Sequence, residues 1–174
     1  MLYLVRHGRP TIDRAVPAHE WELDPAGFDD IWALRTSGRL PPSAVWFSSP
    51  EPKALATAEL LTDGEVGVVE GLREHVREST DWIEDFDDAV RRAFAVPAAV
   101  ALPGWEPLER CRDRVVSAAE GILLAHPDVD VVLVGHGTAW TALSAVLTGT
   151  EPDLERWRAL TMPDLLVVEP LRSR

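Results

Sequence analysis

The chain has 174 residues, of which 46% are hydrophobic, and it carries a formal net charge of −12. This length supports one domain with a real core but rarely two. The acidic balance argues against general nucleic-acid binding and against an anionic membrane surface, so we expect no nucleic-acid and no membrane partner. The single cysteine, Cys111, excludes an internal disulfide and fits a reducing compartment.

The N-terminal residues enter an apolar strand pattern at once, without the basic and long apolar regions that are typical of a signal peptide. No apolar run approaches the ~18 residues that a membrane span requires. These two observations predict a cytoplasmic protein.

Short apolar runs alternate with helical patterns along the chain. In chain order, the pattern predicts a strand at 1–5, a helix at 23–38, a strand at 44–47, a helix at 53–61, a strand at 66–69, helices at 87–95 and 107–125, a strand at 129–134, a helix at 138–147 and a strand at 165–169. Asp24 is the expected N-cap of the first helix, and Pro25 suits its first turn.

This alternation predicts an α/β domain with a mainly parallel central sheet, built as a three-layer α/β/α sandwich. Residues 1–174 are expected to form a single domain. Residues 74–105 combine an acidic patch with a proline-punctuated stretch, so their structure is hard to predict. We expect an excursion from the core here, with a lid at about 76–103.

Two predicted strands end on a histidine followed by a glycine. Residues 4–8 read LVRHG and residues 131–137 read VVLVGHG, which places His7 and His136 at strand ends. In open α/β sheets the ligand site lies beyond the carboxyl ends of the strands. If the two strands are neighbours, both imidazoles can meet in one cleft. Gly8 and Gly137 would each let the backbone turn and bring its N–H toward a ligand.

Four charged residues lie near these strand ends, and each has two interpretations. Arg6 is either half of a structural ion pair or a bidentate clamp for an oxyanion. Lys53, in the first turn of a helix, is either an exposed lysine or a second ligand of that anion. Glu74 follows the third strand as either a solvated carboxylate or an acid, and Arg9 is either solvated or a contact for a second anionic group.

The segment Arg6-His7-Gly8 resembles the signature of the histidine phosphatase superfamily, the phosphoglycerate mutase-like group, in its small phosphatase branch. Four further stretches resemble the family in the right order: LDPAGFDDIWAL, WFSSPEPKALATAELL, GLREH and VVLVGHGTAW. PGWEPLERCRDRV is similar to another helix start of the family. The three-letter signature alone is weak, but the ordered set is specific.

The resemblance implies a covalent mechanism without a metal or another cofactor. His7 would be the nucleophile that carries a phosphohistidine. Arg6, Lys53 and His136 would bind the phosphoryl oxygens of a small phosphorylated substrate. Glu74 would protonate the leaving oxygen and then activate water. The expected activity is hydrolysis of a phosphate monoester, with a phosphohistidine protein phosphatase as an alternative.

The chain departs from the family at Lys53, where an arginine is expected. Lysine keeps the charge but loses the planar fork of the guanidinium. We expect this change to weaken transition-state binding by ~1–2 kcal/mol, the scale of one charge-assisted hydrogen bond. The departure also motivates a second alternative, a catalytically weak phosphate-binding or scaffold protein.

Overall fold

A single mixed sheet organises residues 1–170, the part of the chain that the computed structural model describes. Its strands are β1 (Leu2–Arg6), β2 (Ala44–Ser48), β3 (Val66–Val68), β4 (Asp130–Gly135) and β5 (Asp164–Val168). They lie in the order β3-β2-β4-β1-β5. The first four pair in parallel and β5 runs antiparallel to β1, so the prediction of a mainly parallel sheet is confirmed.

Helices cover both faces of this sheet. They are α1 (Phe28–Thr36), α2 (Pro52–Leu61), α3 (Phe86–Ala95), α4 (Leu108–Ala125), α5 (Gly137–Thr148) and α6 (Leu154–Ala159). The predicted helix at 23–38 is divided, because Asp24 caps a separate 3-10 turn over Pro25–Gly27 before α1 begins. Helix α6 was not predicted, because a helix of six residues is too short to show a periodic apolar face.

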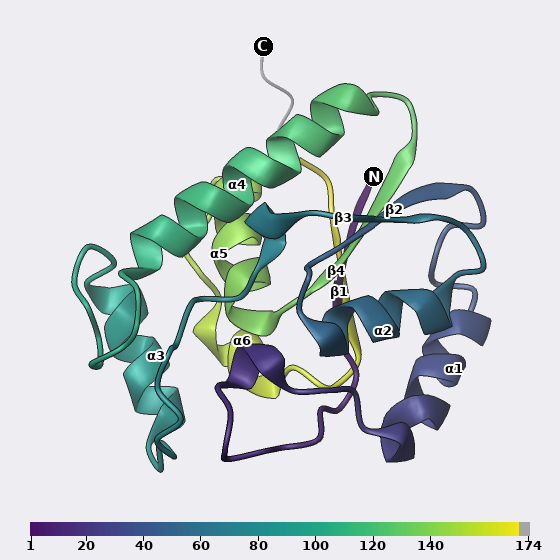
Figure 1. Cartoon of the computed structure of the whole chain (residues 1–174). Helices are drawn as coiled ribbons and strands as arrows, with labels where there is room; N and C mark the ends of the chain where they lie inside the picture. Colours follow the sequence, from purple (N-terminus) through teal and green to yellow (C-terminus); the bar gives the residue numbers. More distant parts are fainter. Residues whose placement is uncertain (171–174) are drawn as a thin grey trace.

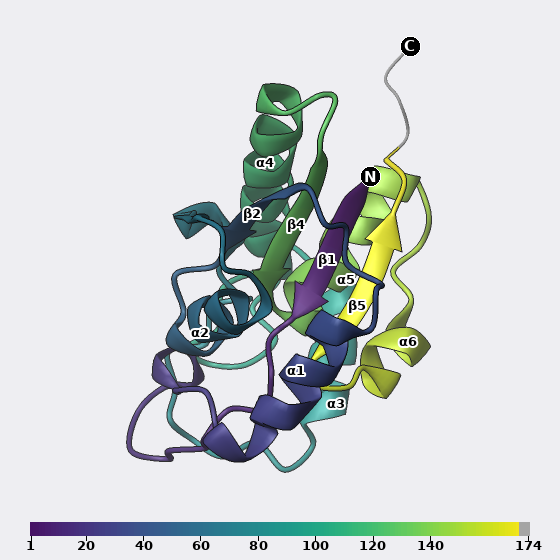
Figure 2. The same ribbon diagram turned by 90° about the vertical axis from the view of Figure 1, so that its right-hand side faces the viewer.

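The strands place alternate side chains in two cores, as a period of two requires. Leu4 and Leu133 pack with α4 and α5 on one face of the sheet. Val5 and Val134 pack with α1 and α2 on the other face. Figure 1 and the turned view in Figure 2 show these two helical layers with the sheet between them. The predicted three-layer sandwich is therefore confirmed.

The pairing of β1 with β4 decides where the site forms. In this parallel pair Arg6 lies opposite Gly135, so the residues that follow, His7 and His136, leave the sheet at the same edge. The backbone N–H of His7 donates to the carbonyl of Gly135 at 2.9 Å and fixes this register. A Cβ at position 135 would lie 2.5 Å from Cζ2 of Trp140, so the first turn of α5 can pack here only against a glycine.

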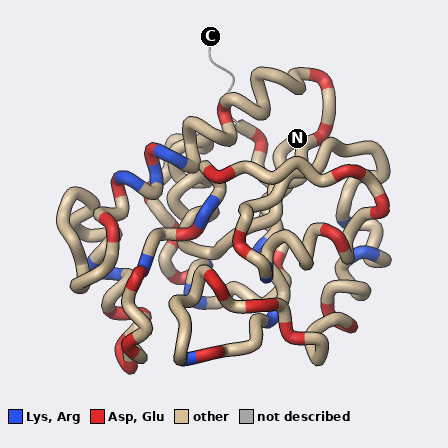
Figure 3. Tube along the Cα trace, in the orientation of Figure 1, with Lys and Arg blue, Asp and Glu red and all other residues tan. Residues whose placement is uncertain are grey.

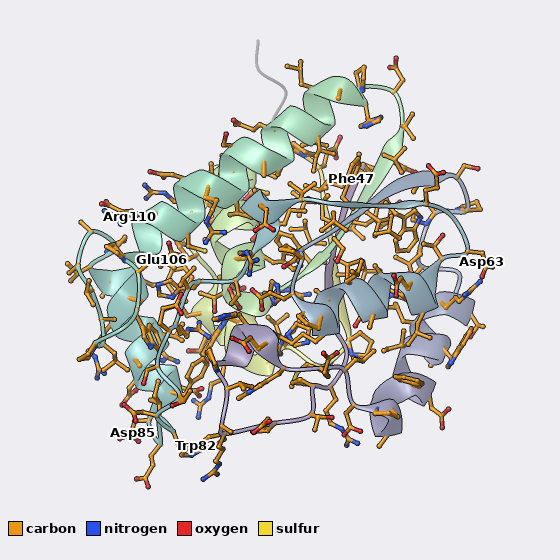
Figure 4. The ribbon with its side chains drawn as sticks, viewed as in Figure 1. Phe47, Asp63, Trp82, Asp85, Glu106 and Arg110 are labelled. Atoms are coloured by element: carbon orange, nitrogen blue, oxygen red, sulfur yellow. The ribbon has the colours of Figure 1, made fainter. Side chains whose placement is uncertain are left out.

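The segment at 76–103 leaves the central sheet and carries α3. It is tied to the chain that precedes α4, since Arg77 pairs with Trp105 in an isolated bridge and the N–H of Glu78 donates to the carbonyl of Gly104. Figure 4 shows Trp82 and Asp85 at the far end of this excursion and Glu106 near the start of α4. Closure of this segment over the site stays a prediction.

Acidic residues are spread over much of the trace, as Figure 3 shows. Within residues 1–170, no helix is both long and apolar enough to span a membrane.

Candidate active site

A cavity of about 550 Å³ opens beyond the carboxyl ends of β1, β2 and β4. Most of the residues predicted to act lie in its wall: Arg6, His7, Lys53, Glu74, His136 and Gly137. The fold thus brings together side chains that lie up to 131 positions apart in the sequence. Arg9 also lines the cavity, whereas Gly8 is not among its lining residues.

His7 presents one ring nitrogen to this cavity. Its Nδ1 donates to the carbonyl of Gly8 at 2.7 Å. This bond places the ring proton on Nδ1 and leaves the lone pair of Nε2 free. The side chain is only 6% exposed. Burial, followed by the nearby His136 and Lys53, lowers the pKa of His7 well below its usual value. The ring is therefore neutral near pH 7, as a nucleophile must be.

His136 lies beside His7 where the paired strands β4 and β1 end, with the two rings in an edge-to-face arrangement and their centroids 5.3 Å apart. Its Nε2 lies 2.8 Å from Ser49 Oγ and 3.4 Å from Glu51 Oε1. Its Nδ1 is buried and has no hydrogen-bond partner in the described part of the chain. Burial lowers the pKa of His136 to about 3. This orphaned nitrogen is one that a bound group could satisfy.

Arg6 reaches the cavity from the end of β1. Its Nη1 donates to the carbonyl of Leu160 at 2.9 Å, which anchors one side of the guanidinium. Its Nε is buried and, among residues 1–170, without a partner. A Cβ at position 137 would lie 3.4 Å from this Nε, so Gly137 leaves room beside the guanidinium. Arg6 thus keeps donors for an anion.

Lys53 is buried, with only 5% of its surface exposed. Its Nζ donates to the carbonyl of Ala18 at 2.6 Å and to Glu51 Oε2 at 2.7 Å. Lys53 is therefore neither the exposed lysine of one interpretation nor a cation free of partners. Glu51 is itself only 2% exposed and forms a buried ion pair with Lys53.

Glu74 lies against the N-terminus of α5. Its Oε1 accepts from the N–H groups of Ala139 and His75, each at 2.9 Å, and its Oε2 accepts from the N–H of Thr138 at 3.2 Å. Burial raises the pKa of this carboxyl, but Arg77, His136 and the N–H of His75 together outweigh burial and lower it. The protein by itself therefore favours the ionised form of Glu74.

Arg77 is a further cation in the wall that the sequence reasoning missed. Its guanidinium lies 4.6 Å from the ring centroid of Trp105 and 4.8 Å from that of Phe86. Its Nη2 donates to Thr138 Oγ1 at 3.1 Å, next to the helix end that holds Glu74. Burial lowers the pKa of Arg77, and Glu74 partly offsets that effect. Arg77 is the main positive charge that acts on Glu74.

Gly8 and Arg9 are engaged with other parts of the protein. The N–H of Gly8 donates to Thr57 Oγ1 at 2.9 Å, and a Cβ on Gly8 would lie 2.6 Å from Cδ1 of Ile31. Arg9 pairs with Asp24 at 2.9 Å. The structure therefore assigns packing and an ion pair to these residues, and their part in anion binding stays a prediction.

Glu51 and Arg77 had only weak signals in the sequence. Glu51 lies two positions before Lys53 in a segment that leads from a buried strand into a helix, a place where an unpaired acid would be costly. Arg77 lies three positions after Glu74 in a stretch without periodicity. Neither pattern indicates which group the side chain meets.

Comparison with known proteins places this chain in a family. The fold places two histidines and a set of cations at the carboxyl edge of an α/β sheet. A model of the histidine phosphatase superfamily (branch 1) matches residues 2–172, and the chain belongs to this family. The expected resemblance is thereby confirmed.

One curated relative is the uncharacterized phosphatase PhoE of Bacillus subtilis (strain 168). It is 30% identical over 117 residues, which cover 64% of this chain. The match spans 56% of that relative, little more than half its length.

Two solved structures share the fold. A mycobacterial glucosyl-3-phosphoglycerate phosphatase is 24% identical with a TM-score of 0.72, over 94% of this chain and 87% of its own. A phosphoserine phosphatase variant from Entamoeba histolytica is 18% identical with a TM-score of 0.72, over the same 94% and 87%. At these identities the likeness concerns the fold alone.

Proposed function

We propose that this chain is a phosphomonoesterase that hydrolyses a small phosphate ester through a phosphohistidine on His7, without a metal. The observation that supports this most is the state of His7. Its ring is neutral, its proton is fixed on Nδ1 by Gly8, and its Nε2 faces a cavity shared with His136 and Arg6. A neutral imidazole is a competent nucleophile near pH 7.

In the first step, Nε2 of His7 attacks phosphorus and the bond from phosphorus to the ester oxygen breaks. Glu74 gives its proton to the leaving alcohol. This role requires a protonated carboxyl, although Arg77 lowers the pKa of Glu74. A phosphoryl group in the cavity would raise the pKa of Glu74 by adding negative charge beside it.

In the second step, water attacks the phosphorus of the phosphohistidine. The Glu74 carboxylate takes a proton from that water, the phosphorus–nitrogen bond breaks, and inorganic phosphate leaves. Arg6, Lys53 and His136 would hold the phosphoryl oxygens in both steps. Phosphoryl transfer depends mainly on such positioning and charge stabilisation.

The substrate is proposed to be a small phosphorylated molecule that is handled in the cytoplasm. The cavity volume of about 550 Å³ lies in the ordinary range for small-ligand sites. The phosphatases of similar fold named above act on glucosyl-3-phosphoglycerate and phosphoserine, which supports this size class.

The test is hydrolysis of an aryl phosphate near pH 6 in the presence of EDTA. We expect the wild type to retain its activity and His7→Ala to lose it while still folding, as circular dichroism would verify. Glu120→Gln, an exposed change on α4, serves as the matched control and should behave like the wild type. Activity that disappears with EDTA, or that survives in His7→Ala, contradicts the proposal.

A second candidate is a phosphate-binding protein with slow turnover. The observation that favours it is the engagement of Lys53 with Glu51 and the carbonyl of Ala18. A lysine held in this way stabilises a transition state less than a free cation does. Binding of inorganic phosphate by a wild type that hydrolyses no aryl phosphate would support this candidate over the first.

A further inference from the structure

The catalytic steps proposed above leave one buried carboxylate without a role. Glu51 lies in the cavity wall, at the start of α2, and contacts three of the residues assigned to the reaction. Its Oε2 accepts from Lys53 at 2.7 Å, and its Oε1 accepts from the N–H of Glu74 at 2.9 Å. Its Oε1 also lies 3.4 Å from His136 Nε2.

These contacts matter because Lys53 and His136 are proposed ligands of the phosphoryl oxygens. An anion that binds to Lys53 shares this donor with the Glu51 carboxylate, and an anion that binds to the neutral His136 ring lies close to the same carboxylate, whose Oε1 is 3.4 Å from Nε2. The position of the Lys53 ammonium group is restrained, because a second of its three N–H donors is bonded to the carbonyl of Ala18. Two anionic groups that share their donors at close range repel strongly unless a proton lies between them.

The charge of the cavity wall supports the same conclusion. Arg6, Lys53 and Arg77 contribute three positive charges, and Glu51 and Glu74 contribute two negative charges. Arg9 and Glu78 also line the cavity, but Arg9 is paired with Asp24 and Glu78 is exposed to solvent, which screens its charge. Arg73 also acts on Glu51, but its own partner is Glu70 at 2.7 Å. Both histidines are neutral because burial lowers the pKa of each. The remaining single positive charge matches one negative charge and not two.

We infer, as an extension that rests on the proposed function, that Glu51 determines the ionisation state of the phosphoryl group that the site accepts. A phosphoryl group with one negative charge binds directly. A phosphoryl group with two negative charges binds only together with one proton. The proton comes from solvent and lies between a Glu51 oxygen and a phosphoryl oxygen. No other bond changes in this binding step.

Glu51 is the carboxylate that responds, rather than Glu74, because of their different partners. Three backbone N–H groups favour the ionised form of Glu74, so a bound phosphoryl group has a larger effect to overcome there before this carboxyl is protonated. Glu51 accepts a single backbone N–H, and its remaining strong contact is Lys53, the cation that the phosphoryl group would draw toward itself. Substitution by glutamine keeps the shape and an acceptor for the Glu74 N–H but removes the charge.

The test is calorimetric titration with inorganic phosphate at pH 8, repeated in buffers of different ionisation enthalpy to count protons. We expect the wild type to take up about one proton per phosphate bound. Glu51→Gln should take up close to none and should bind phosphate at least about ten-fold more tightly, the effect of about 1.4 kcal/mol. Glu120→Gln is the matched control and should behave like the wild type.

A second measurement needs no variant. The affinity of the wild type for phosphate should fall about ten-fold per pH unit above the second pKa of phosphate, as the linkage of one proton requires. An affinity that stays constant over this range overturns the inference even if Glu51→Gln does not fold.

The remaining outcomes separate this inference from the proposed function. Proton uptake that persists in Glu51→Gln shows that another group takes the proton and overturns the inference, while hydrolysis through His7 stands. Phosphate binding without proton uptake in either protein also overturns the inference and leaves hydrolysis through His7 untouched. Absence of both phosphate binding and His7-dependent hydrolysis overturns the proposed function, and the inference with it.

Discussion

Replacement of His136 by asparagine should change how the free energy of unfolding depends on pH. In the folded protein the ring is buried, and burial lowers its pKa from 6.5 to about 3. In the unfolded chain the ring regains its ordinary pKa of about 6.5. Below that pH the unfolded state therefore binds a proton that the folded state does not, so stability falls as the pH falls from about 6.5 toward 3.

The size of this effect follows from the two pKa values. Between pH 7.5 and pH 5.0, one such histidine reduces the free energy of unfolding by about 2 kcal/mol, since each pH unit below 6.5 contributes about 1.4 kcal/mol. His136→Asn lacks this group. The variant should lose about 2 kcal/mol less than the wild type over the same interval, whatever its stability at pH 7.5.

The measurement is urea unfolding at several pH values between 7.5 and 5.0. Val134→Ala is a suitable control, because it removes volume from the buried end of β4 without removing a titrating group. Its stability should lie below that of the wild type by the same amount at every pH. If the curve of His136→Asn also runs parallel to that of the wild type, His136 is not held neutral and the electrostatic account of the site is wrong.

Three further changes test other contacts. Lys53→Arg should raise kcat/KM for an aryl phosphate by about ten-fold, since a second charge-assisted hydrogen bond becomes available; steady-state rates showing no gain would mean that position 53 does not contact the phosphoryl group. Arg77→Gln should move the alkaline decline of kcat/KM to higher pH, because Arg77 lowers the pKa of the acid Glu74; a shift to lower pH in the rate profile would contradict that assignment. Gly135→Ala should cost about 2 kcal/mol in urea unfolding, because its Cβ would lie 2.5 Å from Trp140; unchanged stability would refute the packing argument.

The sequence by itself determined the features that depend on local patterns. Apolar runs and helix signals predict the order of strands and helices, because a buried strand and an amphipathic helix each require a particular spacing of apolar residues. The histidines at 7 and 136 were identifiable because each follows such a strand and precedes a glycine. Helix α6 was missed, because so short an element has no such spacing.

Tertiary structure alone decided which charges meet in the cavity. Glu51 and Arg77 are ordinary charged residues in the sequence, and their importance comes from partners that lie far along the chain. Glu51 meets His136 through the pairing of β2 with β4, and Arg77 meets Thr138 because the excursion at 76–103 begins beside the start of α5. Electrostatic energies depend on distance and burial, which a residue pattern does not contain. The family was therefore readable from the sequence, whereas the neutral histidines and the Glu51–Lys53 pair became visible only in the folded chain.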